Sequence, residues 1–317
     1  MEKAVDRHEL LRRITTFPLI ASGLAEDLLS GSFRSIFKGQ GIEADEVRHY
    51  EPGDDVRSID WNVSARFGTP YVKMYREERE LTVCLVLDRS ASMGTGGTVN
   101  SASGGAFINR ADQAVLAAAL VAFSAERAGQ RVGAVFFDRD ITRVLRPRKG
   151  RSHIMTLISG ALQGGSGEAG TGGERGSNLG AALAGTGRLL KRRSLVVILS
   201  DFLCVNWEQE LGDLCGKHDV IAIGISDPLD MDLPNLGLVS VEDPETALKL
   251  HIPAGFLSLR SAWSQWHGER AALWTAICRR CGAACLELST AEDAPAALTR
   301  FFGGRGRPRR EYRRRGL

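Results

Sequence analysis

An apolar run at residues 83–87 ends in three polar side chains at alternate positions, Asp88, Ser90 and Ser92. Such a run is typical of a buried parallel strand, which delivers the residues after it to the carboxyl edge of a sheet. Alternate residues of an extended chain point the same way, so we expect three oxygens to converge. One carboxylate and two hydroxyls suit a hard cation such as Mg²⁺. The alternative is that Asp88 caps the next helix and the serines form a turn.

A second apolar run, at residues 194–200, ends in Asp201, and Ser177 stands at the start of a predicted helix. In doubly wound sheets, ligands lie outside the carboxyl ends of the strands, where the strand order reverses. We expect both apolar runs to end at that point. The sequence therefore predicts a site for Mg²⁺, with Mn²⁺ or Ca²⁺ as alternatives, formed by Asp88, Ser90, Ser92, Ser177 and Asp201.

Strands and helices alternate through residues 81–302, which predicts an α/β fold with a doubly wound, mostly parallel sheet. Expected strands are 83–87, 131–137, 141–145, 194–200, 219–225, 236–241 and 284–288, with a hairpin at 247–252. The strand at 141–145 is expected at the sheet edge, ended by Pro147. Expected helices are 110–128, 151–163, 178–190, 206–216, 256–281 and 293–302, and glycine-rich loops are expected at 93–105 and 164–176.

Residues 1–80 are predicted to form an N-terminal accessory segment, with helices within 1–17 and 24–36 and an exposed strand at 70–80. Its distinctive part is the charged segment 46–66, in which Pro52-Gly53 marks a turn. Ion pairs are expected there, with buried area supplied by Tyr50 and Trp61; the charged residues are Arg48, Asp54, Asp55, Arg57, Asp60 and Arg66. The segment is interpreted either as a structural clamp on the main domain or as a partner surface.

Composition is that of a globular protein, with 317 residues, 43% apolar and 25% charged. The start of the chain does not read as a secretory signal, and no apolar run approaches the roughly 20 residues of a membrane span. Six scattered cysteines indicate reduced thiols, which favours a cytoplasmic protein. Zinc at Cys278, Cys281 and Cys285 would need a fourth ligand, and the nearest histidine, His267, lies upstream.

The tail, residues 303–317, holds seven arginines and one glutamate, a net charge of +6. The whole chain has a net charge of +3, so the rest of it carries −3. Its Gly/Arg/Pro composition predicts disorder. Nucleic acid is not expected as a partner, except for contact through this tail.

The five proposed ligands resemble the metal-ion-dependent adhesion site of the von Willebrand factor A fold, written D-x-S-x-S, then Thr, then Asp. Ser177 stands where that pattern has Thr, which keeps the hydroxyl and loses the stiffer β-branched rotamer. More narrowly, R-H-Y-E-P-G-D-D-V-R-S-I-D-W at 48–61 and L-D-R-S-A-S-M at 87–93 are similar to the bacterial family called domain of unknown function fifty-eight. Later segments such as I-L-S-D-F and V-E-D-P-E-T match it too.

The resemblance implies a cytosolic protein that acts with a MoxR-type AAA+ ATPase as an adaptor in the assembly or maturation of protein complexes. By the same resemblance, a partner's Asp or Glu carboxylate would take the open position of the metal. We expect no catalysis. The alternatives are a metal-dependent hydrolase or phosphatase with Asp88 as nucleophile, or a scaffold whose site is not functional. Aspartate-based phosphatases use D-x-D, whereas Ser90 stands at the second position here, and no histidine accompanies the motifs.

Overall fold

The computed structural model describes residues 14, 17, 38–78, 81–100, 106–163, 177–242 and 248–305. Two compact units divide the chain: one is Ser30–Leu81, and the other comprises Met1–Leu29 and Thr82–Leu317. The larger unit carries the predicted metal ligands.

A six-stranded sheet forms the centre of the larger unit, in the order β12-β9-β8-β3-β6-β7. Neighbouring strands are parallel except for β7, which pairs with β6 in the antiparallel sense at the edge. The chain runs outward from β3 through β6 to β7 and then returns to the other side of β3 with β8, so the order reverses between β3 and β8. The predicted fold class is confirmed. The strands are β3 (Thr82–Asp88), β6 (Arg131–Phe137), β7 (Ile141–Arg148), β8 (Leu195–Ser200), β9 (Asp219–Ser226) and β12 (Ala284–Ser289).

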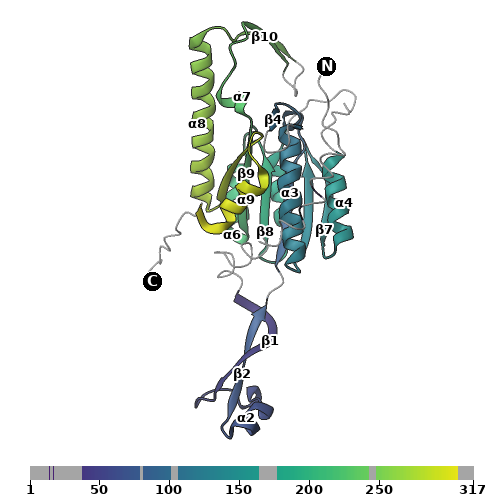
Figure 1. Ribbon diagram of the computed structural model, residues 1–317, viewed down its shortest axis with the longest axis vertical. Helices are drawn as coiled ribbons and strands as arrows, with labels where there is room; N and C mark the ends of the chain where they lie inside the picture. The colour runs from purple at the N-terminus through teal and green to yellow at the C-terminus, as the bar shows by residue number, and fades with distance from the viewer. Residues whose placement is uncertain are drawn as a thin grey trace. The chain divides into compact units, whose positions relative to one another are not determined.

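Helices cover both faces of this sheet (Figure 1). On one face α3 (Arg110–Arg127) packs against α4 (Arg151–Leu162) and α9 (Ala294–Arg300), which continues into the π-helical turn η4 (Phe301–Arg305). On the other face α5 (Leu179–Leu189) packs against α6 (Glu208–Lys217), which in turn contacts α8 (Leu257–Cys281). Each parallel connection therefore follows the strand–helix–strand pattern that the sequence predicted.

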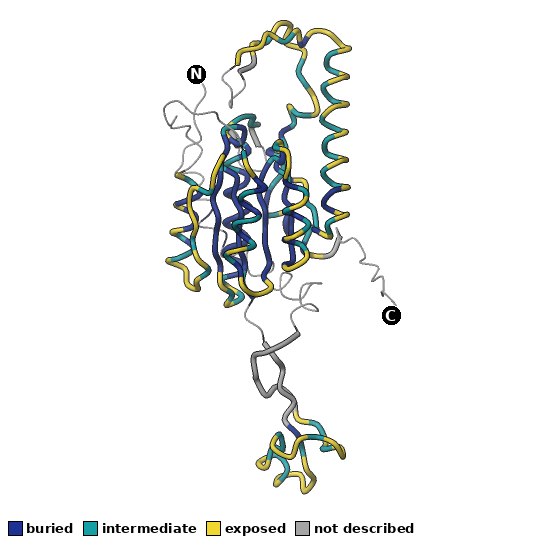
Figure 2. Tube along the Cα trace, turned by 180° about the vertical axis from the view of Figure 1, so that it is seen from behind, coloured by how far each residue is buried: buried dark blue, intermediate teal, exposed yellow. Residues whose placement is uncertain are grey.

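The core lies between the sheet and these helices (Figure 2). Every residue of β8 is buried, and so is every residue of β3 after Thr82, because both strands are covered on two faces. Helix α3 is buried from Gln113 to Ala125, and its many alanines allow the helix to approach the sheet closely. The continuous apolar runs in the sequence have this origin.

Three local expectations need correction, and one connection contains a helix that was not predicted. The loop predicted at 93–105 includes the end of a 3₁₀ turn, η2 (Ala91–Gly94), and the strand β4 (Thr98–Asn100), which pairs with β5 (Ala106–Ile108). Pro147 does not end the edge strand, because β7 runs on to Arg148; an edge position tolerates the missing N–H. The loop after β9 contains a short helix, α7 (Pro228–Met231). The segments predicted at 236–241 and 247–252 pair with each other as β10 (Leu238–Glu242) and β11 (Lys249–Pro253), outside the main sheet.

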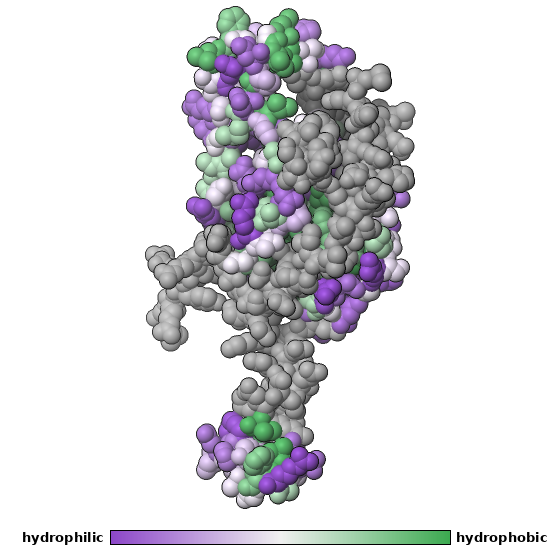
Figure 3. All heavy atoms as spheres, viewed as in Figure 1, coloured by the Kyte–Doolittle hydropathy of each residue, from purple (hydrophilic) through white to green (hydrophobic). Residues whose placement is uncertain are grey.

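Apolar side chains are exposed on this hairpin and the start of α8 (Figure 3). They are Leu236, Leu238, Leu250, Phe256 and Leu257.

The smaller unit pairs β1 (Lys38–His49) with β2 (Tyr71–Glu78) and inserts η1 (Val56–Ser58) and α2 (Trp61–Phe67) between them. Arg48 forms an ion pair with Asp54 at 2.6 Å, as expected, whereas Asp55 and Asp60 cap η1 and α2. Trp61 is 68% exposed, so the expectation that it supplies buried area is wrong. The helix α2 was missed because seven residues hold too few turns to show a period.

Several predictions lie outside the described residues: most of the N-terminal helices, the glycine-rich loop 164–176 and the tail beyond Arg305. Ile14 and Phe17 are described, and both are helical and buried. All six cysteines are free. No helix in the described part of the chain combines the length and the apolar character needed to cross a membrane.

Candidate metal site

The end of β3 gathers the first three predicted ligands. Asp88, Ser90 and Ser92 are 4%, 3% and 8% exposed. The Ser90 N–H donates to Asp88 Oδ1 at 2.9 Å, and the Ser90 and Ser92 hydroxyl oxygens lie 3.0 Å apart. They do not meet through an extended chain, as the sequence suggested, because η2 begins at Ala91 and its turn brings Ser92 back beside Ser90.

Two further hydroxyls reach Asp88 from other segments. Ser177 Oγ donates to Asp88 Oδ2 at 3.2 Å, and Ser200 Oγ donates to the same oxygen at 2.6 Å. The sequence predicted Ser177 but missed Ser200, the last residue of β8. Ser200 is the polar residue that ends the apolar run, one position before Asp201, and this could have indicated its role. At that point β8 lies directly beside β3.

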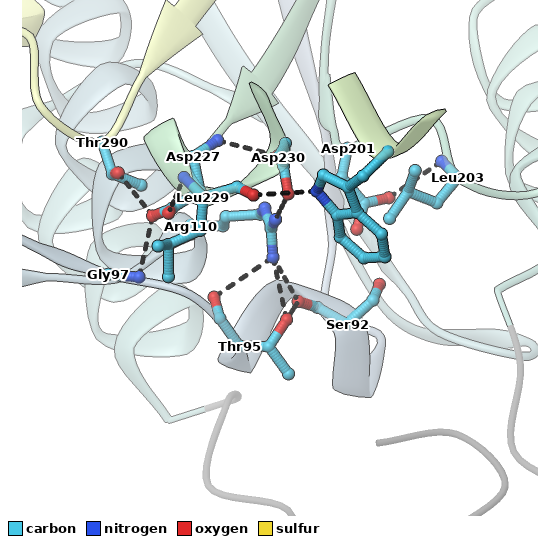
Figure 4. Close-up of polar contacts among 11 residues, drawn as sticks. Ser92, Thr95, Gly97, Arg110, Asp201, Leu203, Asp227, Leu229, Asp230 and Thr290 are labelled. Carbon is cyan, nitrogen blue, oxygen red and sulfur yellow. Dashed lines mark hydrogen bonds and ion pairs between the residues drawn. The ribbon is translucent and has the colours of Figure 1, made fainter. Parts of the chain in front are cut away.

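Asp201 follows β8 and lies next to the Ser92 side chain (Figure 4). The Ser92 hydroxyl lowers the pKa of the Asp201 carboxyl and so favours its ionised form. Its Oδ1 accepts the Leu203 N–H at 3.0 Å, whereas its Oδ2 is buried without a hydrogen-bond partner. Phe202 has a left-handed backbone (φ 52°), which is costly for a bulky residue. Its ring packs against Trp207, with ring centroids 5.3 Å apart, and this contact offsets the backbone cost. The chain therefore turns sharply just after Asp201.

Burial and the neighbouring charge of Asp201 raise the pKa of Asp88 to about 6, against the hydrogen bonds from Ser200 and Ser90 that lower it. The pKa of Asp201 is also raised, chiefly by burial. Two carboxylates that share a buried site oppose each other's ionisation unless a cation lies with them. Without a cation, ionising both Asp88 and Asp201 therefore costs free energy, and a bound cation would remove that cost.

The residues fit a hard cation, because the donor set consists only of oxygens and includes the unpartnered Oδ2 of Asp201. Within the described ranges, no three His, Cys, Asp or Glu side chains group closely enough to hold a metal, so the set relies on hydroxyls. The predicted set, Asp88, Ser90, Ser92, Ser177 and Asp201, is brought together at one edge of the sheet.

A buried arginine, which the sequence did not indicate, supports the turn that carries Ser92. Arg110, the first residue of α3, is 6% exposed. Its Nη1 donates to Thr95 Oγ1 at 2.8 Å and to the Thr95 carbonyl at 3.3 Å, and its Nη2 forms an ion pair with Asp230 of α7 (Figure 4). Arg110 thus ties η2 to the segment after β9.

Asp227, just after β9, is a second buried charged residue that links distant segments. It is 1% exposed and accepts hydrogen bonds from the Gly97 N–H at 2.8 Å and from Thr290 Oγ1 at 2.7 Å. It also begins a capping box with Asp230 at the start of α7. The sequence signal was the D-P-x-D pattern at 227–230, which marks a helix start but says nothing of its distant contacts.

The loop after Asp201 is held against the first turn of α5 by a close approach at Gly180. A Cβ on Gly180 would lie 2.7 Å from the Asn206 carbonyl oxygen, and backbone atoms cannot easily retreat. We expect Gly180→Ala to cost about 1–3 kcal/mol of unfolding free energy, measured by urea denaturation.

Gly187→Ala is the matched control in the same helix. Its Cβ would meet only Leu214 Cδ1, at an ordinary 3.6 Å, so the substitution is expected to stabilise the protein by about 0.4–1 kcal/mol. Equal effects of the two substitutions would contradict the account of the 180–206 contact.

The strand order and the return of the chain beside β3 define a von Willebrand factor A-like fold, and the predicted ligands lie at its point of reversal. The chain belongs to the family described as "Protein of unknown function DUF58", whose model matches residues 46–272. That span includes the charged segment 46–66 and all five predicted ligands.

Mycobacterial relatives match nearly the whole chain. "Uncharacterized protein Rv1480" of Mycobacterium tuberculosis (strain ATCC 25618 / H37Rv) is 32% identical over 304 residues, which cover 96% of this chain and 92% of the relative. "Uncharacterized protein Mb1516" of Mycobacterium bovis gives the same values.

Among solved structures, BatB from Bacteroides thetaiotaomicron is similar with a TM-score of 0.45 and 14% identity, covering 70% of this chain and 97% of that one. The SpRpn10 VWA domain gives a TM-score of 0.32 and 12% identity, covering 69% and 93%. The strand order of the central sheet, and not these scores, defines the fold.

Proposed function

We propose that this protein is a metal-ion-dependent adaptor that binds a partner protein through the carboxyl edge of its sheet. The observation that carries the proposal is the buried Asp88–Asp201 pair, surrounded by hydroxyls and holding one carboxylate oxygen without a partner. Mg²⁺ bound there would offer an electrophilic position to a carboxylate of the partner. Mn²⁺ and Ca²⁺ are alternatives with the same ligand chemistry.

The residues of this chain supply position and charge. Asp88 and Asp201 provide the negative charge, and Ser90, Ser92 and Ser177 provide neutral oxygens that leave the cation attractive to an anionic partner group. Arg110 and Ser200 hold the turn and the carboxylate in place. These roles are binding roles, so we propose an adaptor and not an enzyme.

The proposed partner is a MoxR-type AAA+ ATPase or its client, in the cytoplasm and in the assembly or maturation of protein complexes. Support for this choice comes from the family resemblance carried by the segments 48–61 and 87–93.

The test is capture of a purified MoxR-type AAA+ ATPase by the immobilised protein, in Mg²⁺ or in EDTA. We expect capture to be lost in EDTA and with Asp88→Ala, because each removes the bridging cation. Asp138→Ala is the matched control, since it deletes a carboxylate that follows the neighbouring strand β6 but lies outside the predicted set. Circular dichroism checks that each variant is folded.

Two results would contradict the proposal. Capture that is unchanged in EDTA and in Asp88→Ala would move binding away from the metal edge. Turnover of a phosphoester substrate with Mg²⁺ that disappears in Asp88→Ala would instead support the hydrolase alternative.

A further inference from the structure

A pocket of about 240 Å³ opens beside Asp201. Four segments of the larger unit line it: the loop after β8 from Asp201 to Glu208, the end of β9 with α7, the stretch of α8 between His267 and Ile277, and Glu287 of β12. Asp201 belongs both to the proposed metal site and to the pocket wall. Anything that fills the pocket therefore lies next to the metal edge.

Most of the pocket wall is apolar and aromatic, and its charged side chains are Asp201, Glu208, Asp230, Arg270 and Glu287. Phe202 packs against Trp274 with ring centroids 5.4 Å apart, and both residues line the pocket together with Trp207, Ile225 and Ile277. Gly224 gives the indole room, because a Cβ there would lie 3.1 Å from Trp274 Cη2. An apolar pocket of this size matches one large side chain.

Polar atoms of the wall lack partners. Trp274 Nε1 and His267 Nε2 are buried without a hydrogen-bond partner, as is Asp201 Oδ2. A buried indole N–H without an acceptor is costly, and a carbonyl oxygen of an occupant would satisfy it. Arg270 is already engaged, since it donates to the Phe202 carbonyl at 3.0 Å and lies over the Trp266 ring at 4.9 Å. The wall thus favours an occupant with an apolar body and a carbonyl oxygen.

Apolar surface continues around the mouth of the pocket. Val205, Leu273 and Met231 line it and are 75%, 61% and 46% exposed. A compact metabolite would leave this rim uncovered, whereas a polypeptide segment would cover it on either side of the inserted side chain. The occupant is therefore best matched by a peptide segment.

We propose that the pocket receives a large apolar side chain, such as Phe, Leu or Met, from the same partner segment whose carboxylate binds at the metal edge. The inference rests on the proposed function and adds specificity to it. The cation would recognise any accessible acidic residue, whereas the pocket would select segments that carry an apolar residue close to that acid.

The probes for the test are fluorescein-labelled glycine-based peptides that contain Asp-Phe, Asp-Gly-Phe or Asp-Gly-Gly-Phe, each with a twin in which Ala replaces Phe. Binding is measured by fluorescence anisotropy in Mg²⁺ and in EDTA. At one spacing, the Phe peptide is expected to bind about tenfold or more tightly than its Ala twin, because it buries an aromatic side chain.

Two variants test whether the pocket causes this preference. Ala271→Trp fills the pocket and is expected to remove the difference between the Phe and Ala peptides while leaving the weaker EDTA-sensitive binding of both. Trp274→Phe keeps an aromatic wall and loses the N–H, so it should weaken the Phe peptide by between about two- and tenfold. Ala276→Trp is the matched control, because Ala276 is exposed on the same helix and is not part of the pocket wall.

Each further outcome decides against the inference in a distinguishable way. Phe and Ala peptides that bind equally, with both lost in EDTA, would overturn the pocket and leave the proposed function standing. Binding that is equally tight in EDTA, with the preference for Phe kept, would show a pocket uncoupled from the metal and would contradict both the shared-segment proposal and the metal bridge. A preference that survives Ala271→Trp, or no binding by any peptide, would also overturn the inference.

Discussion

Arg110→Met is expected to cost about 3 kcal/mol of unfolding free energy, close to the lower limit for breaking a buried ion pair. The substitution leaves Asp230, whose side chain is 20% exposed, without its cation. It also leaves both oxygens of Thr95 without the guanidinium that donates to them. Urea denaturation followed by circular dichroism measures the loss.

Arg300→Ala provides the comparison for this result. Arg300 pairs with Glu292 at 3.6 Å, but its side chain is 62% exposed, so its removal is expected to cost less than about 1 kcal/mol. Adding Asp230→Asn to Arg110→Met should recover part of the loss, because the unpaired charge is then gone while the side chain can still cap α7. An Arg110→Met protein as stable as Arg300→Ala would show that the network contributes little.

When no cation is present, Asp88→Asn is expected to increase the free energy of unfolding. The pKa of Asp88 in the folded protein is raised to about 6 from the ordinary 3.8. Its contribution to stability is therefore present below the unfolded pKa and is lost as the pH rises through about 6. The difference between the folded and the ordinary pKa of Asp88 corresponds to roughly 3 kcal/mol of unfolding free energy at neutral pH. Asparagine is neutral and avoids this loss.

In EDTA at pH 7.5, Asp88→Asn should therefore have a higher melting temperature than the wild type, and the advantage should shrink as the pH falls towards 4. Mg²⁺ at a thousandfold excess over Kd should reverse the order, because only the wild type gains binding free energy, about 4.1 kcal/mol, which exceeds its disadvantage in EDTA. Thermal unfolding across pH, with and without Mg²⁺, measures both effects. A variant that is less stable than the wild type in EDTA at pH 7.5 would refute this account of the carboxylate pair.

The sequence predicted the sheet well because its central strands are buried on both faces. The runs at 83–87 and 194–200 are typical of buried strands, and the polar residues after them were expected at one edge of the sheet. Ser177 could be added because a helix start after a glycine-rich stretch belongs to the same edge. These are consequences of local pattern together with the topology of parallel sheets.

Arg110, Asp227 and Asp230 could not be found in this way. Arg110 occupies an ordinary first position of a helix, and its role depends on a residue of α7 that lies 120 positions later in the sequence. Long-range pairing of this kind leaves no periodic or spacing signal. The error at Trp61 has a related cause, because an aromatic residue in a charged segment was assumed to be buried.

The strand β7 has a consequence for association between copies of the protein. As the end strand of the described sheet, it offers unpaired backbone groups to any other extended chain. It carries Arg143, Arg146 and Arg148, all exposed. A second β7 brought alongside would meet like charges. This edge therefore opposes strand-to-strand aggregation while it closes the sheet.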